Sequence, residues 1–286
     1  MAELRVGTCS WKYDSWAGLV YSRPKPPNYL QEYARHFNTV EIDQWFWSLF
    51  GTGKIRLPLP GQAEEYRRSV PPEFRFTIKA PNSLTLTHFY QKNKSALPEP
   101  NPYFLSASLF REFLAGIDPL LPQVGTIMFQ FEYLNKKKMP SLGAFLERLH
   151  RFISQINSPV PLSIEIRNPN FLKTEYFRFL SDNLLGHVFL QGYYMPSVTA
   201  IYQKFRNLAP KTVVIRLHGP GREEIELKTG KKWDKIVESR DAELSAIAAM
   251  IRDLQRGEVD IYVNINNHYE GSAPLTIRKL SALLVP

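Results

Sequence analysis

Eight strand-length apolar segments, separated by amphipathic helical patterns, constrain the fold of this 286-residue chain more than any other feature. The strand-like segments are 4–10, 39–43, 74–80, 124–131, 161–167, 187–192, 213–219 and 260–267. Helical patterns cover 27–37, 102–116, 141–156, 173–184, 239–257 and 273–284, with shorter helices expected within 51–73 and 193–212. Strands that alternate with helices pair in parallel through right-handed crossovers, and eight such units close a barrel. The pattern predicts an α/β fold, a single (β/α)8 TIM-like barrel.

No internal repeat, low-complexity tract or linker divides the chain, so we expect one barrel domain over residues 1–286. A hydrophobic content of 44% suffices for a large core. The single cysteine, Cys9, excludes an intramolecular disulfide and fits a reducing compartment. The N-terminal segment has no basic-then-apolar leader, and no apolar run is long enough to span a bilayer. These features favour a soluble cytoplasmic protein without a membrane partner.

Charged and apolar residues alternate in the segment "PLSIEIRN" (161–168). Successive side chains of a strand point to opposite faces, so Leu162, Ile164 and Ile166 are expected to face the helices. Glu165 and Arg167 then face the barrel interior. Because an isolated charge is costly to desolvate, the two residues must either pair as a structural plug or belong to a functional site.

The same alternation assigns polar side chains of the other strands to the barrel interior. They are Glu41, Asp43, Thr77, Lys79, Thr126, Gln130, Gln191, Arg216, His218, Asn264, Asn266 and His268. These residues gather toward the C-terminal ends of the strands, where barrel active sites form from strand ends and βα loops. A ring of unlike polar groups is a costly way to fill a core, so the set predicts a functional site at that end.

The residue types indicate acid–base chemistry on an anionic ligand. Arg167 and Arg216 can each grip a phosphate or carboxylate through two parallel hydrogen bonds, and Lys79 adds a third positive charge. His218 titrates near neutrality and is the natural proton carrier, with Glu165 or Glu41 as its base or orienting partner. We therefore predict Glu165, His218 and Glu41 as catalytic residues, and the three cations as ligand-binding residues.

Amide and aromatic side chains complete the expected ligand-binding set. They are Gln130, Asn264, Asn266, Asn267 and Trp11. Trp11 belongs to an aromatic group in the first two βα loops, and aromatic rings beside cations can stack on bases or sugar rings. No cofactor is predicted. A divalent metal on Glu41, Asp43 or Glu165 stays open as an alternative, although the sequence has no His-Glu-x-x-His motif.

The net charge of +9 favours anionic partners. Two Lys-rich segments, near 135–139 and 228–235, lie between expected elements, as ligand-facing loops do. We expect an anionic small molecule or single-stranded nucleic acid as the partner. Its affinity should fall as the salt concentration rises.

Seven segments at the expected strand ends carry a family resemblance. In chain order they are "GTCSWKYDSWAGLVY", "FNTVEID", "FRFTIKAP", "VGTIMFQF", "IEIRNPNF", "VIRLHG" and "YVNINNHYEGSAP". On these segments the chain resembles the domain of unknown function 72 family over nearly its whole length. The resemblance implies a barrel fold and no established reaction.

Three functions stay open at this point. The charge pattern favours an enzyme of hydrolase type that acts on a phosphate-bearing or nucleic-acid substrate at the strand C-terminal mouth. The first alternative is a non-catalytic binding protein for nucleic acid or an anionic metabolite. The second is an isomerase or glycoside-type enzyme that uses Glu41 and Glu165 as paired carboxylates.

Overall fold

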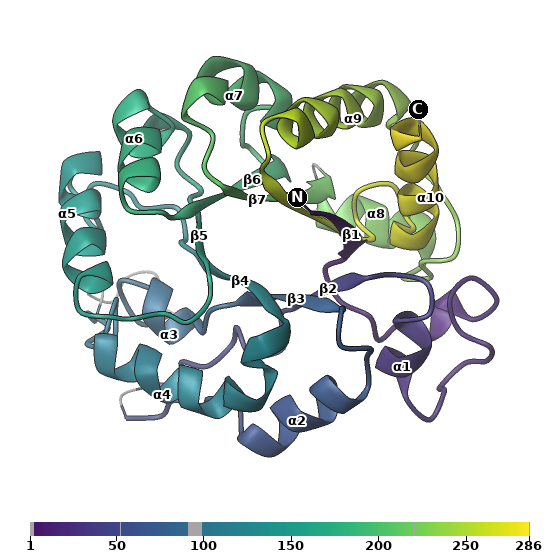
Figure 1. Ribbon diagram of the computed structural model, residues 1–286, viewed down its shortest axis with the longest axis horizontal. Helices are drawn as coiled ribbons and strands as arrows, with labels where there is room; N and C mark the ends of the chain where they lie inside the picture. The colour runs from purple at the N-terminus through teal and green to yellow at the C-terminus, as the bar shows by residue number, and fades with distance from the viewer. Residues whose placement is uncertain (1–2, 52, 91–98, 220, 286) are drawn as a thin grey trace.

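The computed structural model describes residues 3–51, 53–90, 99–219 and 221–285, and its eight strands form one closed parallel barrel. The strands follow one another around the barrel in sequence order, and β1 closes it by pairing with both β2 and β8 (Figure 1). Their bounds are β1 Leu4–Thr8, β2 Thr39–Ile42, β3 Arg75–Lys79, β4 Val124–Gln130, β5 Leu162–Glu165, β6 Gly186–Gly192, β7 Thr212–Gly219 and β8 Asp260–Ile265. The predicted (β/α)8 architecture is confirmed.

Helices surround the barrel as an outer ring (Figure 1). The α-helices are α1 Tyr29–Tyr33, α2 Pro60–Arg68, α3 Asn82–Thr85, α4 Ala107–Ile117, α5 Leu142–Ile153, α6 Thr174–Asp182, α7 Val198–Phe205, α8 Arg222–Thr229, α9 Asp241–Arg256 and α10 Ala273–Leu284. Short 3-10 turns are η1 Asp14–Trp16, η2 Asp118–Gln123, η3 Pro169–Phe171 and η4 Arg206–Leu208. No helix among the described residues is both long and apolar enough to cross a membrane.

Helix α8 occupies part of the segment that the sequence predicts as a Lys-rich loop. Its sequence, "REEIELKT", places two glutamates in the first turn, where their negative charges interact favourably with the positive end of the helix dipole. Arg222 pairs with Glu226 and Lys228 with Glu224, both at helical i,i+4 spacing. Gly230 ends the helix in the left-handed conformation with φ of 58°. Lys228 of the Lys-rich segment is therefore part of a helix and is paired, whereas Lys231, Lys232 and Lys235 follow the helix.

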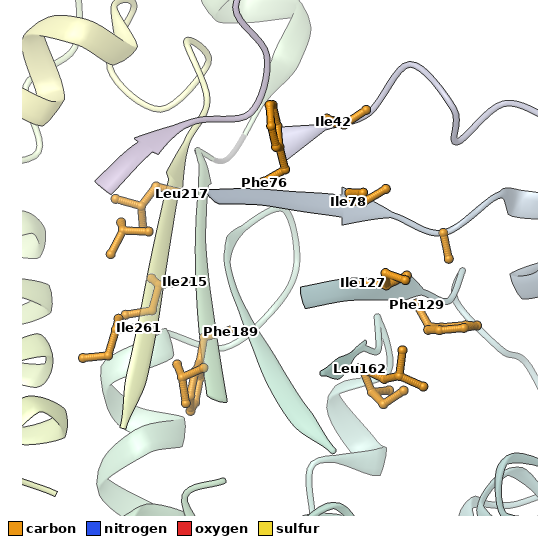
Figure 2. Packing of buried hydrophobic residues seen from close by; sticks show 14 of the residues in the cluster. Ile42, Phe76, Ile78, Ile127, Phe129, Leu162, Phe189, Ile215, Leu217 and Ile261 are labelled. Carbon is orange, nitrogen blue, oxygen red and sulfur yellow. The ribbon is translucent and has the colours of Figure 1, made fainter. Parts of the chain in front are cut away.

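The hydrophobic core lies between the barrel and the helices. Figure 2 shows members of this core on strands β2 to β8. Leu162, Ile164 and Ile166, which the sequence predicts to face the helices, all belong to it. So do the apolar residues that alternate with the interior polar residues of β7 and β8: Ile215, Leu217, Val263 and Ile265. Burial of such side chains supplies the main favourable term in folding. The alternation that turns one strand face toward this core leaves the other face for the barrel interior.

A second, small apolar cluster contains Met128, Val188, Val214 and Tyr262, and we refer to it as the apolar layer. Met128, Val214 and Tyr262 each lie two residues before a predicted site residue. These site residues are Gln130, Arg216 and Asn264, in the same order. Side chains two apart in a strand share a face, so the apolar layer lies inside the barrel, below those polar residues.

The prediction for Gln191 is wrong. Its amide donates to Glu243 of α9 and accepts from the backbone of Val198 at the start of α7. On the same strand face, His187 contacts Tyr176 of α6. The odd-numbered residues of β6 thus face the helices, while Val188 belongs to the apolar layer. Strand β6 therefore contributes a polar residue to the helix packing.

Candidate functional site

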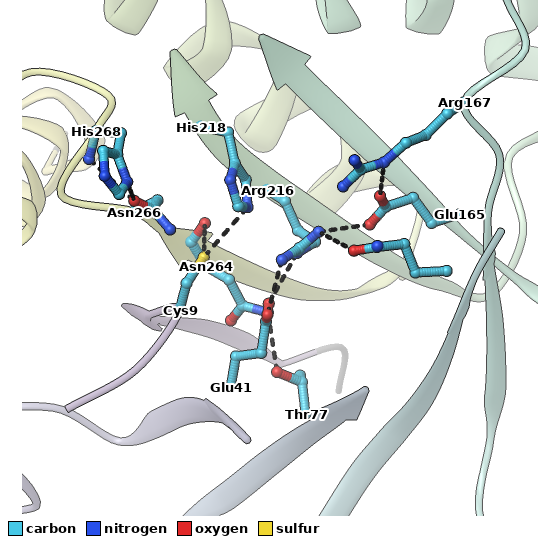
Figure 3. Close-up of polar contacts among 11 residues, drawn as sticks. Cys9, Glu41, Thr77, Glu165, Arg167, Arg216, His218, Asn264, Asn266 and His268 are labelled. Atoms are coloured by element: carbon cyan, nitrogen blue, oxygen red, sulfur yellow. Dashed lines mark hydrogen bonds and ion pairs between the residues drawn. The ribbon is translucent and has the colours of Figure 1, made fainter. Parts of the chain in front are cut away.

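Arg216 of β7 lies at the centre of the polar interior (Figure 3). Its Nε and Nη2 donate to the two carboxylate oxygens of Glu41 at 2.8 and 2.7 Å. Its Nη1 donates to Glu165 at 2.6 Å and to Gln130 at 3.2 Å. The guanidinium thus links β7 to β2, β4 and β5, the three strands that carry its partners. This fork geometry is the one in which arginine binds carboxylates most strongly.

Register brings these partners to one level of the barrel. Glu41 pairs with Thr77, Gln130 with Glu165, and Arg216 with Asn264 on neighbouring strands. Asn264 donates to Thr77 at 2.9 Å and to Glu41 at 3.2 Å. We call this set the ionic layer: Glu41, Thr77, Gln130, Glu165, Arg216 and Asn264. All six are buried.

The charges of the ionic layer shift the pKa values of Glu165 and Arg216 in the directions that favour their ionised forms. Burial alone would raise the pKa of Glu165, but the charges of Arg216 and Arg167 outweigh it and lower this pKa below its ordinary value. Burial acts against the charge of Arg216, but Glu41 and Glu165 outweigh it and raise the Arg216 pKa well above the ordinary value. A carboxylate with a lowered pKa is a poor proton donor. Glu165 and Glu41 both form ion pairs with Arg216. This arrangement fits the structural plug, the first of the two alternatives that the sequence left open.

Four of the residues that lie two positions after members of this layer form a group nearer the strand C-terminal ends. They are Asp43, Lys79, Arg167 and His218, which we call the mouth groups. Unlike the ionic layer, three of the four keep appreciable exposure to solvent, and Lys79 keeps 9%. Any ligand that enters from the C-terminal end meets these groups before it meets the ionic layer.

Arg167 lies just past the end of β5 and its side chain is 24% exposed. Its Nε donates to Glu165 at 3.2 Å, on the oxygen that Arg216 does not contact. The guanidinium also lies 5.1 Å from the ring centre of Tyr193. Gly192, with φ of 127°, makes the turn that brings Tyr193 to this position. Arg167 is therefore anchored at Nε, while the rest of its guanidinium faces the mouth.

Lys79 is the last residue of β3, and its ammonium lies over the ring of Phe46, 3.7 Å from the ring centre. It forms no ion pair with any residue that the structure describes. Burial, and after it the positive charge of Arg216, lowers the pKa of Lys79 to about 8.

Asp43 follows β2 and is partly buried. Burial, and after it the negative charge of Glu41, raises the pKa of Asp43 to about 6. Its carboxyl group therefore exchanges protons near neutrality, which the sequence did not predict. The residue shares the alternation of Glu41, but the extent of its burial depends on the surrounding loops.

His218 lies near the end of β7 beside Cys9, with 3.6 Å between Nε2 and the sulfur. Burial, and then the neighbouring cations led by Arg216, lower the pKa of His218 well below its ordinary value, so the imidazole is neutral at pH 7. Burial likewise raises the pKa of the Cys9 thiol well above its ordinary value. The thiol stays protonated, which argues against a thiolate nucleophile.

The residues after β8 do not join the ionic layer. Asn266 accepts a hydrogen bond from the backbone N–H of His268, and Figure 3 shows this pair apart from Arg216. The Asn267 side chain accepts from the backbone of Ala273 at the start of α10. Asn266 thus hydrogen-bonds to His268 and not to Arg216, and the ligand-binding roles predicted for Asn266 and Asn267 stay predictions. The chain leaves the strand after Ile265, so strand alternation no longer fixes the side-chain direction.

Trp11 is also not available as a ligand-stacking residue in this structure. It is fully buried and packs edge-on against Tyr66, with 5.3 Å between the ring centres. Two other aromatic residues contact the mouth groups: the Tyr193 ring lies beside both Arg167 and His218, and the Phe46 ring lies against Lys79. The sequence signal for Tyr193 is its place directly after Gly192, the last residue of a barrel strand.

The described residues contain no group of three His, Cys, Asp or Glu side chains arranged to hold a metal ion. The carboxylates that the sequence offered for this role include Glu41 and Glu165, and both bind Arg216.

The first Lys-rich segment follows β4. Lys138 pairs with Glu132, while Lys136 and Lys137 are exposed.

Comparison with known proteins identifies a family that matches nearly the whole chain and curated relatives that match part of it. The family described as "Protein of unknown function DUF72" matches residues 5–286. The UPF0759 protein YecE of Escherichia coli, in strains K12 and O157:H7, is 28% identical over 167 residues, or 58% of this chain and 49% of the relative. The chain thus spans about half the length of the curated relatives it matches.

Solved structures show the same fold. A DUF72 family protein from Enterococcus faecalis V583 superposes with a TM-score of 0.71 at 17% identity, over 99% of this chain and 95% of that one. A DUF72 family protein from Thermotoga maritima MSB8 gives a TM-score of 0.67 at 21% identity, over 98% of both chains. The match of the family to nearly every residue, together with this shared barrel, shows that the chain belongs to the DUF72 family of proteins of unknown function.

Proposed function

We propose that this protein is an enzyme that binds a small phosphate-bearing substrate at the strand C-terminal mouth and transfers protons to or from it. The observation that carries the proposal is the contrast between Arg216 and the two cations nearer the mouth. Arg216 is buried and its hydrogen bonds go to Glu41, Glu165 and Gln130. Lys79 and Arg167 are the cations left to face an incoming anion.

Arg167 suits the binding role because its Nε is held by Glu165, while the two terminal nitrogens of the guanidinium remain to bind an anion. Glu165 fixes its Nε, and Tyr193 lies against the guanidinium. A preoriented guanidinium loses less side-chain freedom on binding, and charge-assisted hydrogen bonds to phosphate are among the stronger polar contacts.

Proton transfer is the reaction class that the remaining mouth groups support. Asp43, with its pKa raised to about 6, can donate a proton near neutral pH. His218, with its pKa lowered well below its ordinary value, can accept one as neutral imidazole. An acid and a base of this kind in one mouth resemble the paired groups that enzymes use for acid–base work.

The paired-carboxylate alternative gains no support. A glycoside-type mechanism needs one carboxylic acid that stays protonated near neutrality. Glu165 has a lowered pKa, and both it and Glu41 are held by Arg216. Single-stranded nucleic acid fits the proposal only as a longer phosphate chain that also reaches exposed Lys136 and Lys137.

The test measures the binding of inorganic sulfate, whose charge is constant between pH 6 and pH 8, by calorimetry. We expect the affinity to fall as the pH rises, because Asp43 ionises near pH 6 and Lys79 loses its proton near pH 8. Asp43→Asn should remove the part of this dependence near pH 6. Arg167→Met should weaken binding roughly tenfold, as expected for loss of a charge-assisted hydrogen bond.

The matched control is Arg151→Met, which removes an exposed arginine paired with Glu147 on α5. This variant should bind sulfate like the wild type. Equal affinity in the Arg167 and Arg151 variants would contradict the proposal. A single-stranded oligonucleotide that binds far more tightly than a mononucleotide would extend it toward nucleic acid.

A further inference from the structure

Lys79 differs from the other cations of the barrel interior in having no ionic partner. Arg216 binds two carboxylates and Arg167 binds one. The ammonium of Lys79 instead lies over the Phe46 ring, and no described carboxylate pairs with it. Its side chain rises from the end of β3, one level above Thr77 of the ionic layer. A primary amine is therefore held against an aromatic wall at the barrel mouth.

The surroundings of Lys79 favour the neutral amine. The charged groups that act on it are Glu41 and Asp43 of β2 and its following loop, Glu165 of β5 and Arg216 of β7. Burial and Arg216 outweigh the three carboxylates and lower the pKa of Lys79 to about 8. The neutral amine fraction near neutral pH is then about a hundredfold larger than for an exposed lysine, whose pKa is about 10.4.

We infer that Lys79 is a nucleophile that forms an imine with the carbonyl carbon of an anionic aldehyde or ketone, whose phosphate or carboxylate group binds Arg167. This inference rests on the proposed function and specifies its substrate class. An amine desolvated beside another cation is a recognised way to activate lysine for this chemistry. Neither Glu41 nor Glu165 forms an ion pair with Lys79 that would hold its amine protonated, because both carboxylates are bound to Arg216.

The step is balanced in atoms and charge without an added oxidant or reductant. The amine lone pair attacks the carbonyl carbon, and the oxygen takes a proton from the carboxylic acid form of Asp43 to give a carbinolamine. The nitrogen returns a proton to the Asp43 carboxylate, and Asp43 then gives this proton to the hydroxyl group. The carbon–oxygen bond breaks and water leaves, while the nitrogen lone pair forms the double bond to carbon. The products are a protonated imine, one water molecule and the carboxylate form of Asp43.

Neutral His218 can then remove a proton from the carbon next to the imine. The cationic imine accepts the electron pair, which makes this proton transfer easier than in the parent carbonyl compound. The roles that the proposed function gives to Asp43 and His218 are thereby retained. The reaction class becomes proton abstraction beside a carbonyl group.

The experiment uses pyridoxal 5′-phosphate as a phosphate-bearing aldehyde and pyridoxal as its phosphate-free counterpart. Each is mixed with the whole protein near pH 8, the imine is reduced with borohydride, and the modified lysines are located by peptide mass spectrometry. We expect Lys79 to react roughly tenfold faster than exposed lysines, because the hundredfold larger neutral amine fraction is partly offset by the weaker nucleophilicity of a less basic amine. Lys138, which pairs with Glu132 in the loop after β4, is the internal comparison.

Two variants separate this inference from the proposed function. Lys79→Arg should lose the fast label, while Lys138→Arg should keep it. Arg167→Met should remove the preference for the phosphorylated aldehyde and leave the reaction of Lys79 with pyridoxal intact. The wild-type labelling pattern does not depend on whether either variant folds.

Each outcome decides one of the two statements. If Lys79 reacts no faster than Lys138, the imine inference is overturned, while sulfate binding still tests the proposed function. If Lys79 reacts fast with both aldehydes alike and Arg167→Met changes nothing, the amine is activated but the anion site fails. Fast, phosphate-dependent and Arg167-dependent labelling supports both.

Discussion

The ionic layer and the mouth groups contain the same kinds of charged residue, yet they differ in what those charges contact. In the ionic layer, Arg216 binds Glu41 and Glu165 in a region that water does not reach. Two residues further along the strands, Lys79 has no ionic partner among the described residues and Arg167 is partly exposed. Charge inside a barrel can thus have a structural role at one level and face a ligand at the next.

The physical reason lies in desolvation. A buried charge without a partner is expensive, whereas a complete set of partners compensates most of that cost. Each charged group of the ionic layer has an ion-pair partner, and the apolar layer beneath it contains no charge at all. The mouth groups can remain incompletely paired because they are nearer to water, and they are therefore able to exchange partners or protons.

The largest effect should follow from removing the centre of the ionic layer. Arg216→Met leaves Glu41 and Glu165 buried without a countercharge, so we expect a loss of about 3–5 kcal/mol in the free energy of unfolding. Urea denaturation measures it. Adding Glu41→Gln and Glu165→Gln to this variant should restore part of the stability. A loss below about 1 kcal/mol for Arg216→Met would show that the layer is not structural.

A smaller effect should follow from Glu165→Gln, which keeps the shape but removes the charge. We expect a loss of about 2 kcal/mol near pH 7, as for a hydrogen bond to a charged group. The lowered pKa of Glu165 means that its contribution is fully present above its ordinary pKa of 4.5 and is lost as the pH falls through the lower folded value. The difference between variant and wild type should therefore shrink below pH 4.5, whereas it should be constant above pH 5.

The control for that experiment is Glu147→Gln on α5, because Glu147 is exposed and pairs with Arg151. Its effect at any pH should stay below about 0.5 kcal/mol. A stability difference for Glu165→Gln that does not depend on pH would indicate a packing defect and not the loss of a charge.

The smallest effect on stability should follow from Arg167→Met. Its ion pair with Glu165 is partly exposed, and Glu165 retains Arg216, so we expect a loss below about 1 kcal/mol. The same variant should bind sulfate roughly tenfold more weakly. If it instead destabilises the protein as much as Arg216→Met, then Arg167 belongs to the structural layer and the comparison between the two levels breaks down.

The segment 161–168 shows how far strand alternation can be used. Ile164 and Ile166 lie in the core against the helices, and Glu165 lies inside the barrel, as their spacing predicts. Arg167 lies just beyond the strand, yet it still contacts Glu165. Alternation also places Arg216 inside correctly, because β7 extends through Gly219. It fails for Asn266 because β8 ends at Ile265, and for Gln191 because that side of β6 faces the helices.

The sequence by itself determined the eight strands, their order in a parallel barrel and, for most strands, which side chains point inward, because these depend on local periodicity and short connections. Only the tertiary structure decided which charges meet. Arg216 and Glu41 are 175 residues apart, and their contact depends on the register around the closed barrel. It also decided that Lys79 has no such partner and that Asp43 holds its proton to about pH 6, since burial and neighbouring charge are properties of the assembled mouth.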